Sequence, residues 1–214
     1  MPATLRLTED VMSNGAETAL PPRPRMIFVV HGSVTVDASA LHGEAAFSGE
    51  DAVTLRAGRE GATLWRFEFL TGAPGAIGAH GLVSREKLAA PLETLPEGAL
   101  LLRGDSVAFP PGGCAYLHRH QGPGIRCVIE GGIRIDTHGK STSYGPGGAW
   151  YETGPDPVFA QAALDRPTRF IRVMILPRAL LGKSSIEYLN QEDRAKPKSQ
   201  SYKLFADMPI GGDA

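Results

Sequence analysis

Short runs of β-forming residues recur along most of this chain, and nearly every run ends at a residue that favours turns. The 214 residues include 26 glycines and 17 prolines, so tight turns are available at short intervals. Strands about 8–12 residues apart, with almost no helical periodicity between them, are typical of β-barrels and β-sandwiches. The sequence therefore predicts an all-β fold with few short helices. The expected strands are residues 26–30, 33–37, 52–57, 63–70, 99–102, 106–109, 115–120, 125–130, 133–137, 149–152, 157–162 and 169–176.

Two stretches lack this strand pattern. Residues 72–92 are rich in glycine and alanine, which predicts a connector with one helical turn at residues 84–89. After Pro177 the sequence predicts a short helix at residues 184–190 and then a polar run at 192–201. We expect this tail to pack across the barrel or against a partner subunit.

An internal repeat relates the two halves of the chain. Residues 25–37, RMIFVVHGSVTVD, align with residues 124–136, GIRCVIEGGIRID. Two further matches follow in the same order, which favours a duplication over chance. They pair residues 49–53 with 147–151 and residues 63–67 with 169–173.

The repeat predicts two related β-barrels in one chain. Residues 1–95 would form a degenerate first half, which lacks part of its opening strands. Residues 96–178 would form the second barrel, and residues 179–214 the tail.

The charge balance argues against several classes of partner. The chain has 22 basic and 23 acidic side chains, and therefore a formal net charge of −1. It lacks the positive field by which proteins hold nucleic acid or anionic membranes. No apolar run approaches the roughly 18 residues that span a bilayer. We expect a small-molecule ligand, no nucleic acid and no membrane.

The N-terminal residues and the cysteines bear on the compartment. Residues 1–24 contain no apolar segment of the kind found in signal peptides. Cys114 and Cys127 are too few for a disulfide framework. A single bridge across a hairpin is conceivable, but buried free thiols fit a cytoplasmic protein better. The predicted location is the cytoplasm.

His118 and His120 lie two residues apart at the end of an expected strand. Alternate residues of a strand point to the same face, so both imidazoles can approach one metal ion. Further ligands would come from neighbouring strands. The alternative is that both histidines are hydrogen-bonded residues at the rim of a barrel.

The spacing around this pair resembles the first motif of the cupin superfamily. That motif is a glycine, five residues, HxH, three or four residues, a glutamate, six residues and a glycine. Gly112, the two histidines and Gly131 keep this spacing. The resemblance covers residues 100–176 well and residues 25–70 weakly. It implies double-stranded β-helix, or jelly-roll, barrels of the bicupin type, and by analogy a homodimer.

The same resemblance implies a divalent metal ion, either iron, manganese, nickel or zinc. Two expected ligands are replaced, however. Gly124 stands at the position of the family's glutamate, and Val158 at that of the histidine of the second motif. In the first half the positions that match the two histidines are Ala19 and Pro21, which implies a barrel without metal.

A third donor would be needed, because two histidines alone hold a divalent cation weakly. Glu152, Gln121 and Tyr151 are the candidates on nearby strands. Glu152 would complete a site of two histidines and one carboxylate, either as metal ligand or as catalytic base. The alternative is that Glu152 pairs with a basic side chain, Arg126 or Arg172.

Positions 124 and 126 lie two residues apart at the start of an expected strand and therefore share a face. Arg126 should thus point into the barrel, as the family's glutamate at position 124 would. A buried guanidinium needs a carboxylate partner, because a lone buried charge is very costly. That partner is either Glu130 or Glu152, or else a carboxylate or phenolate of a substrate that Arg126 clamps. The expected aromatic walls of a ligand pocket are Trp150, Tyr151, Tyr116 and Phe159.

These residues support two main functions. The resemblance implies a cupin-type metalloprotein that acts on a small aromatic or carboxylate compound, as a dioxygenase or isomerase. His118 and His120 would bind the metal, Glu152 would be third ligand or base, and Arg126 would clamp an anion. The alternative is a non-catalytic cupin that binds or senses a small ligand and has an incomplete metal site. A third possibility is an accessory β-barrel whose tail drives dimerisation.

Overall fold

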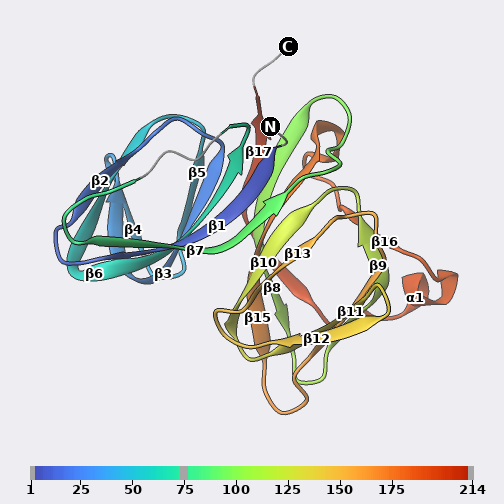
Figure 1. Cartoon of the computed structure of the whole chain (residues 1–214). Helices are drawn as coiled ribbons and strands as arrows, with labels where there is room; N and C mark the ends of the chain where they lie inside the picture. Colours follow the sequence, from blue (N-terminus) through green and yellow to red (C-terminus); the bar gives the residue numbers. More distant parts are fainter. Residues whose placement is uncertain (1–2, 73–76, 212–214) are drawn as a thin grey trace. The chain divides into compact units, whose positions relative to one another are not determined.

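The computed structural model describes residues 3–72 and 77–211, and the chain divides into two compact units, Met1–Glu93 and Thr94–Ala214. Both units consist of antiparallel strands, and the described helices are one short α-helix and one 3-10 turn (Figure 1). The prediction of an all-β fold with few short helices is therefore confirmed. No helix among the described residues is long and apolar enough to cross a membrane.

The first unit is one sheet of seven strands that wraps around an apolar core. Its order is β4-β3-β6-β1-β7, with β2 paired to β6 and β5 paired to β3. Alternate residues of the long strands fill the core, among them Ile27, Val29 and Leu64, which are fully buried. The strands are β1 (Thr4–Met12), β2 (Glu17–Leu20), β3 (Arg25–Val36), β4 (Ser39–His42), β5 (Ala46–Gly49), β6 (Val53–Leu70) and β7 (Leu82–Pro91).

The helical turn predicted for residues 84–89 is wrong. These residues belong to β7, which pairs with β1 along its whole length. The local sequence Arg-Glu-Lys-Leu-Ala-Ala favours a helix, but backbone pairing with a distant strand overrides that weak preference. Residues 73–76 of the predicted connector lie outside the described part of the chain.

The second unit consists of two five-stranded sheets. One has the order β13-β10-β15-β8-β17 and the other β12-β11-β14-β9-β16. Residues such as Val128, Ile133 and Phe170 meet between the sheets in a common apolar core. The strands are β8 (Leu100–Phe109), β9 (Cys114–His120), β10 (Gly124–Glu130), β11 (Ile133–Thr137), β12 (Lys140–Tyr144), β13 (Ala149–Glu152), β14 (Val158–Ala162), β15 (Thr168–Pro177), β16 (Ile186–Tyr188) and β17 (Ser201–Ile210).

The tail adds one strand to each sheet of the second unit. β16 pairs with β9, and β17 pairs with β8 from Leu100 to Ala108. A helix predicted for residues 184–190 is wrong, because that segment contains β16. The only α-helix among the described residues, α1 (Gln191–Ala195), comes after it. The tail thus packs on the barrel of its own unit.

The two aligned segments of the repeat have the same irregularity. In β3 the register against β6 shifts between Val29 and His31. In β10 the register against β15 shifts between Val128 and Glu130, the equivalent positions. A duplication would produce such a shared bulge, since bulges are conserved within families. The duplication itself stays a prediction.

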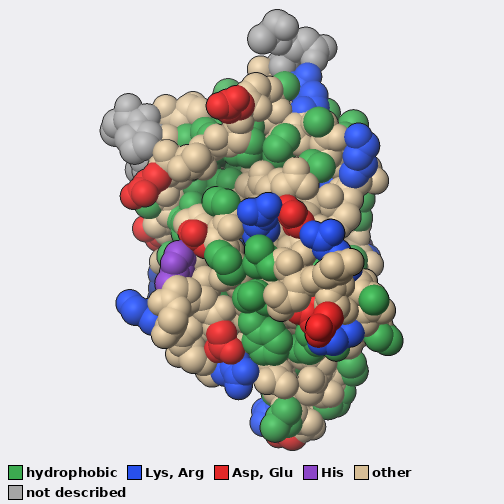
Figure 2. Space-filling view, turned by 90° about the vertical axis from the view of Figure 1, so that its right-hand side faces the viewer, with side chains coloured by type: hydrophobic (Ala, Val, Ile, Leu, Met, Phe, Trp, Pro, Cys, Tyr) green, Lys and Arg blue, Asp and Glu red, His purple; other side chains and the backbone are tan. Residues whose placement is uncertain are grey.

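Cysteine chemistry and surface charge add two further facts. Neither Cys114 nor Cys127 forms a disulfide, as expected, and Cys127 is buried. On the face shown in Figure 2, acidic and basic side chains are interspersed, with no large area of one sign. This pattern agrees with the net charge of −1.

Candidate functional site

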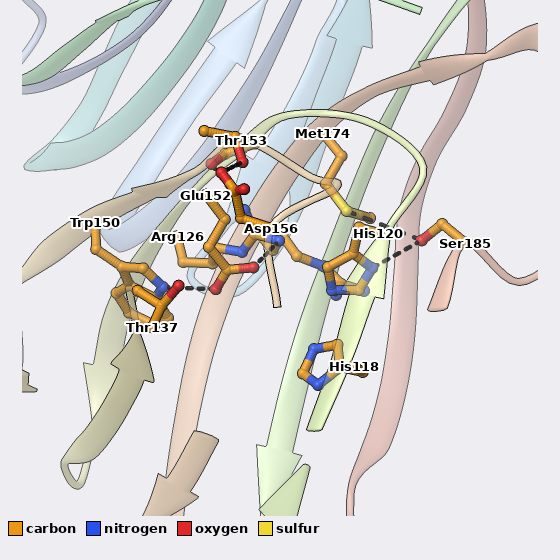
Figure 3. A network of polar contacts seen from close by, with 12 residues as sticks. His118, His120, Arg126, Thr137, Trp150, Glu152, Thr153, Asp156, Met174 and Ser185 are labelled. Carbon is orange, nitrogen blue, oxygen red and sulfur yellow. Dashed lines mark hydrogen bonds and ion pairs between the residues drawn. The ribbon is translucent and has the colours of Figure 1, made fainter. Parts of the chain in front are cut away.

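His118 and His120 both point into the barrel of the second unit, from the end of β9 (Figure 3). Their ring centroids are 5.0 Å apart, and the rings meet edge to face. Both side chains are buried, as are Arg126, Glu152 and Arg172 from the opposite sheet. The structure therefore brings together all four residues of the predicted site, and adds Arg172.

His118 has a defined tautomer. Its Nδ1 lies 2.7 Å from the backbone oxygen of Tyr116. A carbonyl oxygen can only accept a hydrogen bond, so Nδ1 carries the proton and Nε2 keeps a free lone pair. Burial is the main cause that lowers the pKa of His118, so the ring is neutral at physiological pH.

His120 is held on both of its ring nitrogens. Its Nε2 lies 3.4 Å from Nη1 of Arg172, and its Nδ1 lies 3.3 Å from the hydroxyl of Ser185. Guanidinium groups only donate, so Nε2 is the acceptor and Nδ1 donates to Ser185. Burial, and then the charges of Arg172 and Arg126, hold the pKa of His120 well below its usual value.

Arg126 and Glu152 form a buried ion pair, with Nη2 2.7 Å from Oε2. Nη1 of Arg126 also donates to the backbone oxygen of Gly124, and the indole of Trp150 donates to Oε1 of Glu152 at 2.8 Å. Burial lowers the pKa of Arg126 to about 10, against the opposing effect of Glu152. Of the two protein partners considered for Arg126, Glu152 is the one observed. Both oxygens of Glu152 are engaged.

Arg172 makes a two-pronged contact with a carboxylate in the site, and sequence reasoning missed its role. Its Nε and Nη2 donate to the two carboxylate oxygens of Asp105, at 2.9 and 2.6 Å. Burial acts to lower the pKa of Arg172, but the charge and hydrogen bonds of Asp105 outweigh it, so the shift is upward.

The repeat contained a signal for this pair. In the alignment of residues 63–67 with 169–173, Arg66 matches Arg172. In the first unit, Arg66 likewise donates from Nε and Nη2 to both oxygens of an aspartate, Asp10, at 2.7 and 3.1 Å. The two units thus have the same forked ion pair at aligned arginines.

A divalent metal ion does not fit the residues as they are arranged. A Cβ atom at position 124 would lie 2.6 Å from the backbone oxygen of Val173, so no side chain fits there without a shift. Val158, which stands where the family has its fourth ligand, a histidine, pairs directly with His118 across β14 and β9. The position next to His118 therefore holds a valine, which cannot bind a metal ion. Among the described residues, no group of three His, Cys, Asp or Glu side chains is placed to hold a metal.

The charges of the side chains inside the barrel also argue against a divalent metal ion. The guanidinium groups of Arg126 and Arg172 line the interior with both histidines, and one of them contacts His120. A divalent cation is repelled by such groups, and Glu152 already neutralises Arg126. The ligand set of His118, His120 and Glu152 therefore stays a prediction that this arrangement does not support. Of the two other donors considered, Gln121 is exposed and Tyr151 half-buried.

Two cavities meet at His120 and Arg172. The inner one, between the histidines and Trp150, measures about 20 Å³, which is room for roughly one water molecule. The outer one measures about 260 Å³ and lies between β8, β15, the tail strand β17 and residues 182–186. Tyr202 and Ile186 line both. Of these two cavities, only the outer one has room for a ligand, and we call it the tail pocket.

The predicted aromatic walls fall mostly outside these cavities. Trp150 lines the inner one. Tyr116 instead lies under the ammonium groups of Lys196 and Lys198, and Phe159 lies under the guanidinium of Arg134. The aromatic side chain of the tail pocket is Tyr202, from a strand that the sequence did not indicate.

Comparison with known proteins identifies the fold. No family model matches the sequence, and no curated protein sequence matches it. Solved structures do match. AerE from Microcystis aeruginosa aligns over 83% of this chain and 89% of its own, with 12% identity and a TM-score of 0.59. A cupin 2 conserved barrel domain protein from Leptotrichia buccalis aligns over 81% and 84%, with 12% identity and a TM-score of 0.50.

Oxalate decarboxylase from Bacillus subtilis, a protein described as having Mn(II) centres, aligns over 90% of this chain and 73% of its own. Its identity is 14% and its TM-score 0.61. At such low identity these likenesses show the fold alone. The cupin jelly-roll fold expected from the spacing around the histidines is confirmed, and the bicupin ancestry stays a prediction.

Proposed function

We propose that this chain is a cupin-fold protein that binds a small organic molecule in the tail pocket without a metal ion. The observation that carries the proposal is the contact between Arg172 and His120, 3.4 Å apart. A guanidinium group there uses the imidazole lone pair that a metal ion would need. This function corresponds to the non-catalytic alternative that the sequence suggested, because two of the expected metal ligands are replaced.

The tail pocket has the composition of a small-ligand site. Ile186, Tyr202 and Leu204 give it apolar walls, while His120, Arg172 and Ser185 place polar groups at its inner end. Pockets with mostly apolar walls and a few convergent polar groups are the usual form of ligand sites. The exposure of Tyr202, 51%, and Leu204, 58%, is explained if a ligand covers them.

The polar groups at the inner end are fixed before any ligand arrives. Asp105 holds Arg172 from behind, and Arg172 and Ser185 together orient the ring of His120. Because these groups need no rearrangement, little conformational entropy is lost when a ligand contacts them.

A metal-dependent enzyme, of the dioxygenase or isomerase type, is the second candidate. One observation favours it: Nε2 of His118 keeps a free lone pair inside the barrel, next to the ring of His120. The homodimer and the cytoplasmic location remain predictions under either function.

Metal analysis of the purified protein separates the two candidates. Cells would be grown with ample manganese, iron, nickel and zinc, and the metal content of the protein measured by mass spectrometry. We expect wild type to carry no more metal than the His118→Ala/His120→Ala variant. One equivalent of metal in wild type, absent from the double variant, would overturn the metal-free proposal.

A further inference from the structure

The charges around the tail pocket do not cancel. Three basic residues are among those that line it, Arg103, Arg172 and Lys183, against two acidic residues, Asp105 and Asp207. Arg172 is paired with Asp105, and Arg103 with Asp207. Within the described residues no ion pair of Lys183 is found. One positive charge on the pocket is left over.

Lys183, which carries this unpaired charge, lies on a turn that several hydrogen bonds hold in place. Arg103 donates from Nη1 to the backbone oxygen of Lys183 at 2.6 Å, and from Nη2 to that of Leu180 at 2.7 Å. The backbone N–H of Lys183 also donates to the oxygen of Leu180 at 2.8 Å. The turn from 180 to 183 is therefore fixed to β8 by one arginine.

The same arginine connects that turn to the last strand. Its Nε and Nη2 donate to the two oxygens of Asp207 in β17, at 2.8 and 3.1 Å. Asp207 in turn accepts a hydrogen bond from the backbone N–H of Gly182 at 2.8 Å. Both side chains are nearly buried, at 8% and 11% exposure, so the pair is screened little by solvent.

We propose that the tail pocket selects a small organic monoanion, and that Lys183, positioned by the Arg103–Asp207 pair, is the residue that recognises its charge. This inference rests on the proposed function, because it names the ligand class for the same pocket. The apolar body of the ligand would lie against Tyr202, Leu204 and Ile186, with its anionic group toward Lys183.

A pair of matched probes tests the charge selection. 2-Naphthoate and 2-naphthamide have the same ring system and differ in charge, and their binding can be measured by calorimetry. We expect the naphthoate to bind about fivefold more tightly, as for a partly exposed ion pair, and this preference to shrink at high salt. Lys183→Met should remove the preference, and Lys183→Arg should keep it.

The positioning role is tested by a variant for which charge and geometry predict opposite results. Asp207→Asn makes the pocket more positive, so charge alone would strengthen naphthoate binding. If the pair positions Lys183, the loosened turn should instead reduce the preference for naphthoate over naphthamide. Arg103→Lys, which keeps the charge but loses the fork, should reduce it as well. Circular dichroism would confirm that each variant is folded.

Each outcome decides between the proposals. Equal binding of both probes to wild type would overturn the charge selection and leave the small-ligand function standing. Failure of both probes to bind would overturn the two together. A stronger preference for naphthoate in Asp207→Asn would overturn the positioning role of the pair.

Discussion

At the scale of single residues, glycine at position 124 explains why Arg126 pairs with Glu152 inside the barrel. A larger side chain there would strike the backbone of Val173 and the side chains of Met174 and Arg126. The space that a glutamate would need is taken by Arg126, which donates to the backbone oxygen of Gly124 itself. Arg126 then needs Glu152 as its counter-charge, and this requirement removes Glu152 from other roles.

Loss of Glu152 should therefore destabilise the protein strongly. Glu152→Gln leaves the guanidinium of Arg126 buried without a counter-charge, which costs about 3–5 kcal/mol. The matched control is Glu130→Gln, which breaks the half-exposed pair with Arg169 and should cost less than about 1 kcal/mol. Thermal unfolding followed by circular dichroism measures both. Equal effects of the two substitutions would contradict the structural role of Glu152.

Sequence reasoning predicted that the two histidines share one face of a strand, but it missed the role of Arg172 beside His120. His118 and His120 were found because strand parity is a local property, readable from two positions. The role of Arg172 depends on Asp105, its partner across the strands, which is far away in sequence. Such a contact depends on the register between two strands, which the sequence does not reveal. The only signal in the sequence was the alignment of Arg172 with Arg66 in the internal repeat.

At the scale of elements, the tail strand β17 is one of three strands of the second unit, with β12 and β16, that the sequence did not predict. Its outward positions include lysine, leucine and tyrosine, so it lacks a clean alternation of apolar and polar residues. It becomes a strand because β8 offers an unpaired edge. The central strands were predictable, since their buried faces are continuous runs of aliphatic residues.

Removal of the tail should therefore destabilise the second unit. A chain truncated after Leu180 loses the buried side chains of Ala206 and Ile210 and leaves the edge of β8 open. We expect a loss of at least about 3 kcal/mol and concentration-dependent self-association, since open strand edges pair with other chains. Thermal unfolding and light scattering after gel filtration measure these effects. A chain truncated after Ile210 is the control, and similar behaviour of both would refute the prediction.

At the scale of the whole molecule, the two units share the forked arginine–aspartate pair but use it differently. In the first unit Arg66 also contacts Glu68, at 2.5 Å, so the arginine is satisfied inside the unit. In the second unit the remaining nitrogen of Arg172 faces His120 and the tail pocket. The same forked pair thus has all its contacts inside the first unit, whereas in the second unit it also borders the proposed ligand site.

This difference predicts unequal effects of the equivalent substitutions. Asp105→Asn leaves Arg172 without a carboxylate and should cost about 3–5 kcal/mol, whereas Asp10→Asn should cost less because Glu68 remains. The chain has two tryptophans, Trp65 and Trp150, one in each unit.

Their fluorescence allows each unit to be followed separately during urea unfolding. The Trp150→Phe background reports Trp65, and the Trp65→Phe background reports Trp150. Each aspartate substitution should shift the midpoint reported from its own unit. An unchanged Trp150 midpoint in Asp105→Asn would show that the forked pair does not carry the stability assigned to it.

The pairing of β17 with β8 also determines when the tail pocket is complete. Leu100 pairs with Ile210, so the two strands that flank the tail pocket are separated by most of the second unit. Such long-range closures are slow, because the chain loses loop entropy before the contacts form. The wall made by Tyr202 and Leu204 forms only when this pairing is complete. The ligand proposed above could therefore bind only after β17 has paired with β8.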